Sequence, residues 1–480
     1  MNIKINGKIE PIPQDSITVS ELLELKQVKY PDMVSVQLNG EFVERILFDK
    51  TTVNEDDEFE FLYFMGGGSQ GWDFATRAIH SCPPIESTNN PTVPPIYQSA
   101  AFSYDTAEEI ETVFDGRGFG YIYSRISNPT VTAFEYKINS LENGVGTVAA
   151  ASGMSAILNS ILALAGSGEE IIASKSLFSG TRSLFDEVLS KLGIKVIYAD
   201  INDTATLQSL ITDKTRLVFC ETIGNPLLDI TDFLKLADLA HKHRIPLIAD
   251  STLTTPYLFK AKDFGVDIVV HSATKYLTGN GTAVGGVITD LGNFDWNNSL
   301  SGDIRDNAKN FGQFAFLSVL RKKILQNTGG VLSPFNAFLH NLGVETLSLR
   351  MERHCTNASE LALYLSNHKK VKKITYPGLN KNPYYALAKN QFSGKFGALL
   401  NFSLESREDC FKFISRLKMT KNLANLGDSK TMVIHPASTL FSSLPKEHRL
   451  SIGITDEMIR VSIGIEAIRD IIEDFENALS

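Results

Sequence analysis

The residues best suited to chemistry include a lysine in the segment Ser272-Ala273-Thr274-Lys275, directly after an apolar run at 267–270. If that run is a strand, its end places two hydroxyls and one amine at the edge of a sheet, where open α/β sheets bind ligands. Hydroxyls can hold a phosphate, and a lysine amine can form a Schiff base with an aldehyde. Because most of the 46 lysines and arginines are expected on the surface, this interpretation needs further ligand-binding groups elsewhere.

Polar and aromatic groups also follow other apolar runs. Asp250 ends a run at 247–249, and a carboxylate at a buried strand tip is costly without a cationic or protonated partner. A protonated pyridine nitrogen would be such a partner, and it would make the ring an electron sink. Asn225 follows the run at 217–220, and Phe178 precedes small residues.

Two other segments suit a phosphate group. Gly153 and Met154 lie in a small-residue turn that opens an apolar helix, and a helix N-terminus presents N–H groups and a positive dipole end to an anion. Tyr123 and Arg125 are two residues apart, so an extended chain directs both side chains to one face, where they could clamp a phosphate. Taken alone, Arg125 is better explained as an exposed, ion-pairing arginine.

The elements that must position these groups alternate between strands and helices. Short apolar runs at 171–173, 196–198, 217–220 and 247–249 alternate with helical stretches such as 232–241. This alternation predicts a largely parallel α/β sheet.

The first sixty-five residues have a different pattern. Thr18 and Glu21 predict a capping box that opens an amphipathic helix, and Asn39-Gly40 predicts a hairpin turn between strands. The segment therefore predicts a small α+β module with one helix.

Composition limits the classes of function. A chain of 480 residues is expected to form two or three domains, and its net charge of −9 provides no basic field for nucleic acid or an anionic membrane. The four cysteines contain no Cys-x-x-Cys pair, so we expect no metal site and reduced thiols in a cytoplasmic protein. The apolar stretch at 156–165 is too short to cross a bilayer, and no secretory signal is visible.

In their order, the motifs around Tyr123, Ser152, Glu221, Asp250 and Lys275 resemble the pyridoxal-phosphate-dependent enzymes of cysteine and methionine metabolism. The resemblance implies fold type I, with a mostly parallel central sheet and a smaller C-terminal α+β domain. It implies that Lys275 holds the cofactor aldehyde and shuttles protons. The other implied cofactor contacts are Asp250 at the ring nitrogen, Phe178 stacked on the ring, Asn225 at the ring hydroxyl, Gly153, Met154, Ser272 and Thr274 at the phosphate, and Tyr123 and Arg125 reaching it from a neighbouring subunit.

The resemblance extends to the substrate end of the chain. Arg460 matches the family's carboxylate-binding arginine, and its planar fork suits an amino acid's α-carboxylate. Thr431 is expected to contact substrate as well, whereas His435, before a proline, is expected to be a structural turn residue. The implied assembly is a homodimer or a dimer of dimers.

Phe178 bears on the reaction. Family members that break carbon–sulfur bonds usually have a tyrosine there, whose hydroxyl can protonate a departing thiolate, and phenylalanine cannot donate a proton. A departing carboxylate needs less acid help because its conjugate acid has a pKa near 4 rather than about 8.5. The absence of that hydroxyl fits an acyl ester substrate such as O-acetylhomoserine. The stretches at 343–354 and 425–430 resemble the O-acetylhomoserine sulfhydrylases most, with cystathionine γ-synthase or γ-lyase activity as alternatives. A sulfur-carrier or docking protein with a degenerate enzyme body is an alternative of another class.

The N-terminal module resembles the ubiquitin-like sulfur carriers of thiamine biosynthesis, which have a β-grasp fold and a Gly-Gly tail. Gly67 and Gly68 correspond to that tail, since glycine can thread a narrow adenylating-enzyme channel. A carrier needs a free terminal carboxylate, but the chain continues into Ser69. Either a protease cuts after Gly67 or Gly68, or the module is a tethered relic or regulator.

These patterns predict the following division of the chain: a β-grasp module at 1–65, a Gly-rich linker at 66–72, an arm toward a partner subunit at 73–135, a cofactor domain at 136–325 and a substrate domain at 326–480.

Overall fold

The N-terminal module has the predicted β-grasp arrangement in this computed structural model, which describes residues 1–28, 31, 34–63, 71–83, 89–114 and 118–480. Its five-stranded sheet has the order β2-β1-β7-β4-β5, and β1 and β7 run parallel. The elements are β1 (Asn2–Ile5), β2 (Lys8–Pro11), β3 (Ile17–Thr18), α1 (Val19–Leu25), β4 (Val34–Leu38), β5 (Glu41–Phe42), η2 (Arg45–Leu47), β6 (Thr52–Val53) and β7 (Glu58–Tyr63).

Local signals in this module are confirmed. Thr18 and Glu21 form a reciprocal capping box at the start of α1. Asn39 and Gly40 turn the chain between β4 and β5 with φ angles of 53° and 85°, the left-handed values that a tight hairpin turn requires. The Gly67–Gly68 tail lies outside the described residues.

The module has a hydrophobic core of its own, separate from the other clusters, with Leu22 and Phe59 fully buried. We expect Phe59→Ala to lower the stability of the module by about 3–5 kcal/mol, because truncation of a buried phenylalanine leaves a cavity. In calorimetry of the full chain, an early transition should move down while the main transition stays in place. Phe219→Ala, in the core of the large sheet, should move the main transition instead, and a single shared transition in both variants would contradict separate cores.

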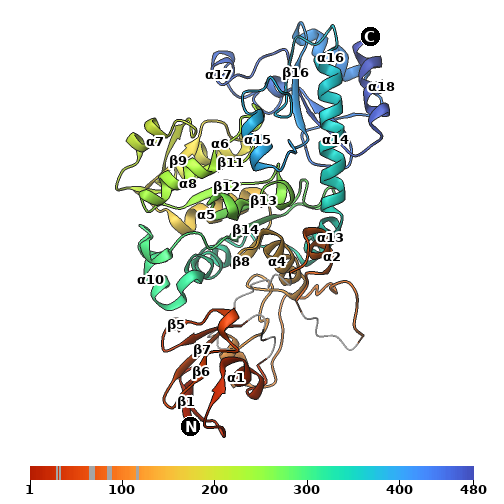
Figure 1. Ribbon diagram of the computed structural model, residues 1–480. Helices are drawn as coiled ribbons and strands as arrows, with labels where there is room; N and C mark the ends of the chain where they lie inside the picture. The colour runs from red at the N-terminus through yellow and green to blue at the C-terminus, as the bar shows by residue number, and fades with distance from the viewer. Residues whose placement is uncertain (29–30, 32–33, 64–70, 84–88, 115–117) are drawn as a thin grey trace.

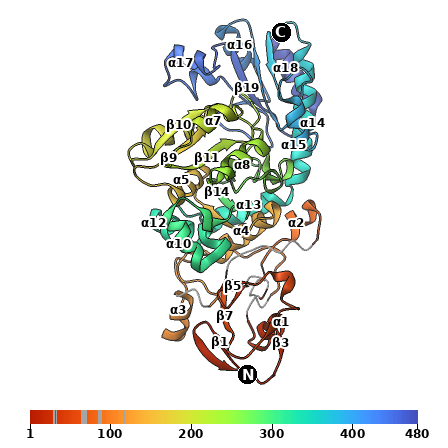
Figure 2. The ribbon, with the colours of Figure 1, turned by 60° about the vertical axis from the view of Figure 1, so that its left-hand side comes forward.

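The module contacts the large domain through β4 and the edge strand β5 of its sheet. The ring of Phe42 lies 5.6 Å from that of Phe314, and Gln37 donates a hydrogen bond of 3.2 Å to the Asn310 carbonyl. Figures 1 and 2 show the module next to α10, at the end of the molecule opposite the C-terminal helix α18. This contact joins segments more than 260 residues apart.

The large domain is built on a seven-stranded sheet of order β10-β9-β11-β12-β13-β14-β8. Strands from β10 to β13 pair in parallel, and β14 and β8 are antiparallel to their neighbours, so the predicted mostly parallel sheet is confirmed. The strands are β8 (Gly146–Ala150), β9 (Glu170–Ser174), β10 (Lys195–Ala199), β11 (Thr215–Glu221), β12 (Leu247–Asp250), β13 (Ile268–Ser272) and β14 (Gly286–Asp290).

Helices cover both faces of this sheet. Successive residues of β13 belong to different core clusters, with Val269 in the cluster that includes α4 and α8 and Val270 in the cluster that includes α5. Strands buried on both faces explain the continuous apolar runs in the sequence. The helical elements are α2 (Phe74–His80), α3 (Ala107–Phe114), α4 (Pro129–Glu142), α5 (Gly153–Leu164), α6 (Ser179–Ser183), η3 (Leu184–Leu189), α7 (Thr204–Leu210), α8 (Phe233–Lys242), α9 (Thr255–Leu258), η4 (Ala261–Phe264), η5 (Trp296–Asn298), α10 (Gly302–Phe311), η6 (Gly312–Phe314), α11 (Ala315–Ser318), η7 (Val319–Leu325), α12 (Gln326–Thr328) and α13 (Pro334–Glu345).

The C-terminal domain contains a second five-stranded sheet, of order β15-β16-β19-β18-β17, and a long helix packs against β15 and β16. Its elements are α14 (Leu347–Ser366), β15 (Lys373–Thr375), α15 (Tyr385–Gln391), β16 (Leu399–Ser403), α16 (Arg407–Arg416), β17 (Lys421–Asn422), β18 (Met432–Ile434), η8 (Pro436–Ser438), α17 (Lys446–Ser451), β19 (Met458–Ser462) and α18 (Ile468–Leu479). Figure 1 shows the long helix, α14, beside the sheet.

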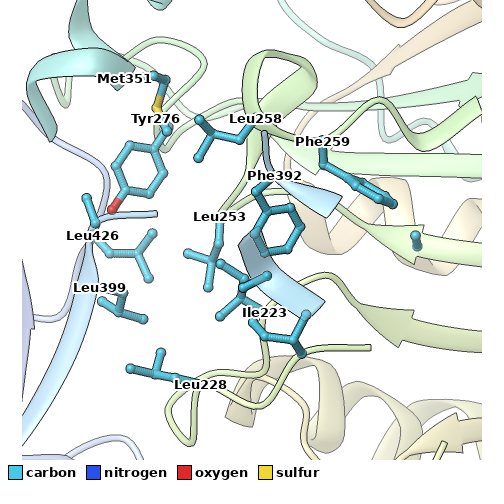
Figure 3. Packing of buried hydrophobic residues seen from close by; sticks show 14 of the residues in the cluster. Ile223, Leu228, Leu253, Leu258, Phe259, Tyr276, Met351, Phe392, Leu399 and Leu426 are labelled. Carbon is cyan, nitrogen blue, oxygen red and sulfur yellow. The ribbon is translucent and has the colours of Figure 1, made fainter. Parts of the chain in front are cut away.

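One continuous core joins the large and C-terminal domains. Figure 3 shows Leu253 and Tyr276 of the large domain facing Leu399 and Leu426 of the C-terminal domain. Tyr276 is fully buried and directly follows Lys275, so the lysine is held at the boundary between the two domains. Among the described residues, no helix is both long and apolar enough to span a bilayer.

Candidate active site

A cavity of about 320 Å³ opens at the carboxyl ends of β11, β12 and β13, which is the ligand-binding edge of an open parallel sheet. Residues far apart in the sequence meet in its wall. The predicted site residues that line it are Gly153, Met154, Phe178, Asn225, Asp250, Ser272, Thr274, Lys275 and Arg460.

Lys275 presents its amine to this cavity. Burial, and next the Arg460 cation, lower the pKa of Lys275 to about 8, so much more of the amine is neutral near pH 7 than in an ordinary lysine, and the neutral amine is the form that attacks an aldehyde. Its Nζ donates a hydrogen bond to Oδ1 of Asn425. The amine is therefore oriented by a side chain of the C-terminal domain.

Asp250 lies at the end of β12 in an ordered turn. The Thr252 amide donates to Oδ1 of Asp250 at 2.9 Å, and the Ser272 amide donates to Oγ1 of Thr252 at 2.8 Å. Burial raises the pKa of Asp250, because a buried carboxylate is costly when it is charged. A protonated partner beside it would offset that cost.

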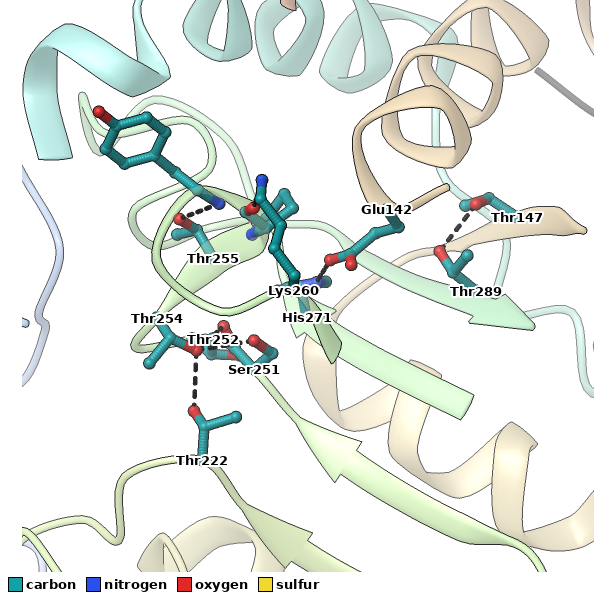
Figure 4. A network of polar contacts seen from close by, with 12 residues as sticks. Glu142, Thr147, Thr222, Ser251, Thr252, Thr254, Thr255, Lys260, His271 and Thr289 are labelled. Atoms are coloured by element: carbon teal, nitrogen blue, oxygen red, sulfur yellow. Dashed lines mark hydrogen bonds and ion pairs between the residues drawn. The ribbon is translucent and has the colours of Figure 1, made fainter. Parts of the chain in front are cut away.

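Figure 4 shows the hydroxyl network that orders the same turn. Thr254 contacts the hydroxyls of Ser251 at 2.7 Å and Thr222 at 2.9 Å. Ser251 is fully buried in this network and does not line the cavity. The network therefore orders the turn that follows Asp250 without occupying the cavity.

The other end of the cavity suits an anion. Gly153 opens α5, and a Cβ built on it would lie 2.6 Å from Cβ of Ser272, so only glycine allows the two segments to approach this closely. The α5 N-terminus and the Ser272 and Thr274 side chains thus surround one point in the wall, and such a helix end binds phosphate.

These groups fit pyridoxal 5'-phosphate. An amine, a buried carboxylate and a phosphate cradle line a single cavity, and each can pair with one end of that cofactor. The Phe178 ring fits as a stacking partner, since a Cβ at Gly180 would lie 2.5 Å from its Cε1 atom. Gly180 therefore leaves room for the ring in this position.

Arg460 adds a buried cation to the cavity wall. It lies on β19, is 3% exposed, and its Nη1 donates to Oδ1 of Asn225 at 2.9 Å. Burial lowers the pKa of Arg460 to about 10. Within the part of the chain that the structure describes, no carboxylate pairs with it, so an anionic ligand group would complete its coordination.

Three predicted residues lie away from this cavity. Tyr123 is exposed, and Arg125 donates to the Gln326 carbonyl at 2.6 Å. The hydroxyl of fully buried Thr431 donates to Glu466 at 2.8 Å, so it orders the loop before β18 and is not brought to the cavity. His435 caps η8, as expected of a structural turn residue.

Sequence reasoning assigned no role to Glu221 and Asn425, which also line the cavity. Glu221 follows an apolar run in the same way as Asp250 does, so position at a strand end could have identified it. Asn425 lies on a C-terminal loop, and no local pattern indicates that it meets Lys275.

A lysine, an aspartate and a phosphate cradle at the strand ends of this sheet define a pyridoxal-phosphate-dependent enzyme of fold type I. The chain belongs to the Cys/Met metabolism PLP-dependent enzyme family, whose model matches residues 75–480. Residues 3–68 match the ThiS family.

Curated relatives and solved structures agree with this assignment. The O-acetyl-L-homoserine sulfhydrylase of Corynebacterium glutamicum is 39% identical over 85% of this chain and 97% of its own length. A Campylobacter jejuni structure, described as a putative O-acetylhomoserine (thiol)-lyase with N'-pyridoxyl-lysine-5'-monophosphate, has a TM-score of 0.81 and 34% identity over 85% of this chain and 100% of that one. A Wolinella succinogenes structure, described as an O-acetylhomoserine sulfhydrylase with a novel mechanism of sulfur transfer, has a TM-score of 0.67 and 40% identity over 74% and 99%.

Proposed function

We propose that this enzyme replaces the acetoxy group of O-acetyl-L-homoserine with a sulfur nucleophile, giving homocysteine and acetate. The observation that carries the choice of reaction is Phe178 in the cavity wall, because its ring offers no proton to a leaving group. Acetate leaves without that help, whereas a thiolate does not. The names of the C. glutamicum and C. jejuni relatives support the same substrate class.

Each lining residue has a role in this proposal. Arg460 holds the α-carboxylate of the substrate, and Lys275 Nζ takes the proton from the α-carbon and assists at the β-carbon. Asp250 faces the ring nitrogen of the cofactor, and Asn225 donates to its ring hydroxyl. Pyridoxal phosphate, when bound, supplies an electron sink conjugated to the substrate's amino group.

Tyr123 and Arg125 act across a subunit interface in this proposal. They lie outside the cavity of their own chain, and a phosphate in a partner's cavity would be a suitable ligand for the exposed phenol and guanidinium. The active site would then be complete only in a homodimer or a dimer of dimers.

Phe178→Tyr is expected to change leaving-group preference. Turnover of O-acetylhomoserine with sulfide should change little, while cleavage of the thioether cystathionine should rise about tenfold or more, because the new hydroxyl can protonate a thiolate. Products are identified by mass spectrometry. Phe178→Leu, which removes the ring without adding an acid, should not gain thioether cleavage, and a wild-type enzyme that prefers cystathionine or methionine to O-acetylhomoserine would contradict the proposed reaction.

The fused ThiS module suggests the sulfur donor. We propose that a thiocarboxylate on Gly67 or Gly68 delivers sulfur in place of free sulfide, after an adenylating enzyme and a protease have acted on the tail. The covalent fusion supports this, as does the sulfur-transfer mechanism in the description of the W. succinogenes structure.

This donor predicts a processed chain. Intact mass spectrometry after co-expression with an adenylating enzyme of the sulfur-carrier type and its sulfur donor should show a fragment ending at Gly67 or Gly68, heavier by the exchange of one oxygen for sulfur. Gly68→Pro should prevent processing at this tail and leave sulfide-dependent turnover intact. A wild-type chain that stays uncut and unmodified would count against a carrier role.

A further inference from the structure

Glu221 is a buried carboxylate in the cavity wall to which the proposed reaction assigns no role. It ends β11, and it stands in register with Asp250 at the end of the parallel strand β12. Register partners on neighbouring parallel strands lie about 5 Å apart and direct their side chains to the same face. The sheet therefore places two carboxylates side by side at one end of the cavity.

The two oxygens of Glu221 join two segments of the cavity wall. Oε1 accepts a hydrogen bond of 2.6 Å from the Phe178 amide, and Oε2 accepts one of 3.2 Å from the Asn225 amide. These are backbone groups of the residues proposed to stack on the cofactor ring and to donate to its hydroxyl. Asn225 in turn accepts from Arg460 at 2.9 Å, so one carboxylate connects the ring contacts to the carboxylate-binding arginine.

The neighbouring charges make this arrangement sensitive to a bound cation. Burial, and next the Asp250 carboxylate, raise the pKa of Glu221 well above its usual range. A protonated ring nitrogen beside Asp250 would lower the repulsion between the two carboxylates.

We propose that Glu221 is a positioning residue of the cofactor site, which holds Phe178 and Asn225 in place and, beside Asp250, favours a proton on the ring nitrogen. This inference rests on the roles proposed above for Phe178, Asn225 and Asp250. It concerns the geometry and charge of the site and is independent of the sulfur donor and of the acyl group of the substrate.

Two substitutions separate the two effects. In the cofactor-bound site, where a protonated ring nitrogen would keep Glu221 ionised, Glu221→Gln removes the charge and one acceptor, so the dissociation constant for pyridoxal phosphate should rise about tenfold or more. The pH midpoint of the bound cofactor's visible absorbance should also fall by about one unit, because the substitution removes a nearby anion that stabilises the protonated form of the cofactor. Glu221→Asp retains the charge but is too short to reach both amides, so its midpoint should stay while cofactor affinity and visible circular dichroism decrease.

Glu170→Gln provides the matched control. Glu170 is also a buried strand glutamate, at the start of β9 and beside Thr215, which begins β11. It lies about 20 Å from Glu221 by strand rise, and its replacement should reduce thermal stability without changing the cofactor spectrum.

A purely structural role would overturn the inference: Glu221→Gln and Glu221→Asp would then behave as Glu170→Gln does, with lower stability and wild-type cofactor affinity, dichroism and midpoint. If Glu221→Gln does not fold, the dichroism and affinity of Glu221→Asp decide in the same way. Asp250→Asn separates a failure of the role of Glu221 from a failure of the proposed cofactor site. A spectrum altered by Asp250→Asn but not by either Glu221 variant refutes this inference alone, whereas a spectrum unaltered by Asp250→Asn refutes the site itself.

Discussion

Lys275→Ala is expected to lower kcat for homocysteine formation by at least ~10³-fold, because one amine both binds the cofactor aldehyde and moves the substrate's α-proton. The purified variant should also lose the visible absorbance of covalently attached cofactor. Borohydride reduction of the wild-type protein, followed by peptide mapping, should place the cofactor on Lys275.

Lys260 is the matched control for this substitution. Burial lowers the pKa of Lys260 to about 8, as at Lys275, but its amine contacts the Pro256 carbonyl and the ring of Phe74, outside the cavity. Lys260→Ala should keep the visible absorbance and most of the turnover. Retention of more than a few per cent of kcat in Lys275→Ala would show that another group performs the chemistry.

The sheet and most of the cavity could be predicted from the sequence because of the geometry of parallel strands. Asp250 and Lys275 follow apolar runs, and carboxyl ends of parallel strands converge at one edge. Groups that end neighbouring strands therefore come together even though the sequence does not show strand order. The capping box at Thr18 and the turn at Asn39-Gly40 were predictable for a related reason, since each depends only on residues within one turn.

Side-chain contacts between segments that are distant in the sequence could not be predicted. Thr431 follows the loop that carries Asn425, but its hydroxyl is bonded to Glu466 and is unavailable to the cavity. The packing of Phe42 on Phe314 joins two domains without any local periodicity. Glu221 was recognised within a motif, yet its partners are backbone amides, which have no sequence pattern of their own.

Arg460→Lys tests whether substrate recognition depends on geometry or on charge alone. The guanidinium donates to two different residues: Nη1 donates to Oδ1 of Asn225, and Nη2 donates to the Asn425 carbonyl at 3.3 Å. A lysine keeps the charge but cannot orient a planar fork toward a carboxylate. We therefore expect kcat/KM for O-acetylhomoserine to fall about 100-fold, equivalent to ~3 kcal/mol, mainly through a higher KM.

A substrate analogue and a control arginine distinguish this effect from general damage. The α-carboxamide of O-acetylhomoserine lacks the anion, so the wild-type enzyme should strongly prefer the acid, and Arg460→Lys should lose most of that preference. Arg216 lies near the start of β11, where it pairs with Glu169. Arg216→Lys should leave kcat/KM for O-acetylhomoserine and the preference for the acid near wild type. Full discrimination in Arg460→Lys would mean that another group binds the carboxylate.

Since Arg460 also lowers the pKa of Lys275, an unchanged pH profile in this variant would show that the retained charge, and not the shape of the fork, sets the protonation state of the catalytic amine.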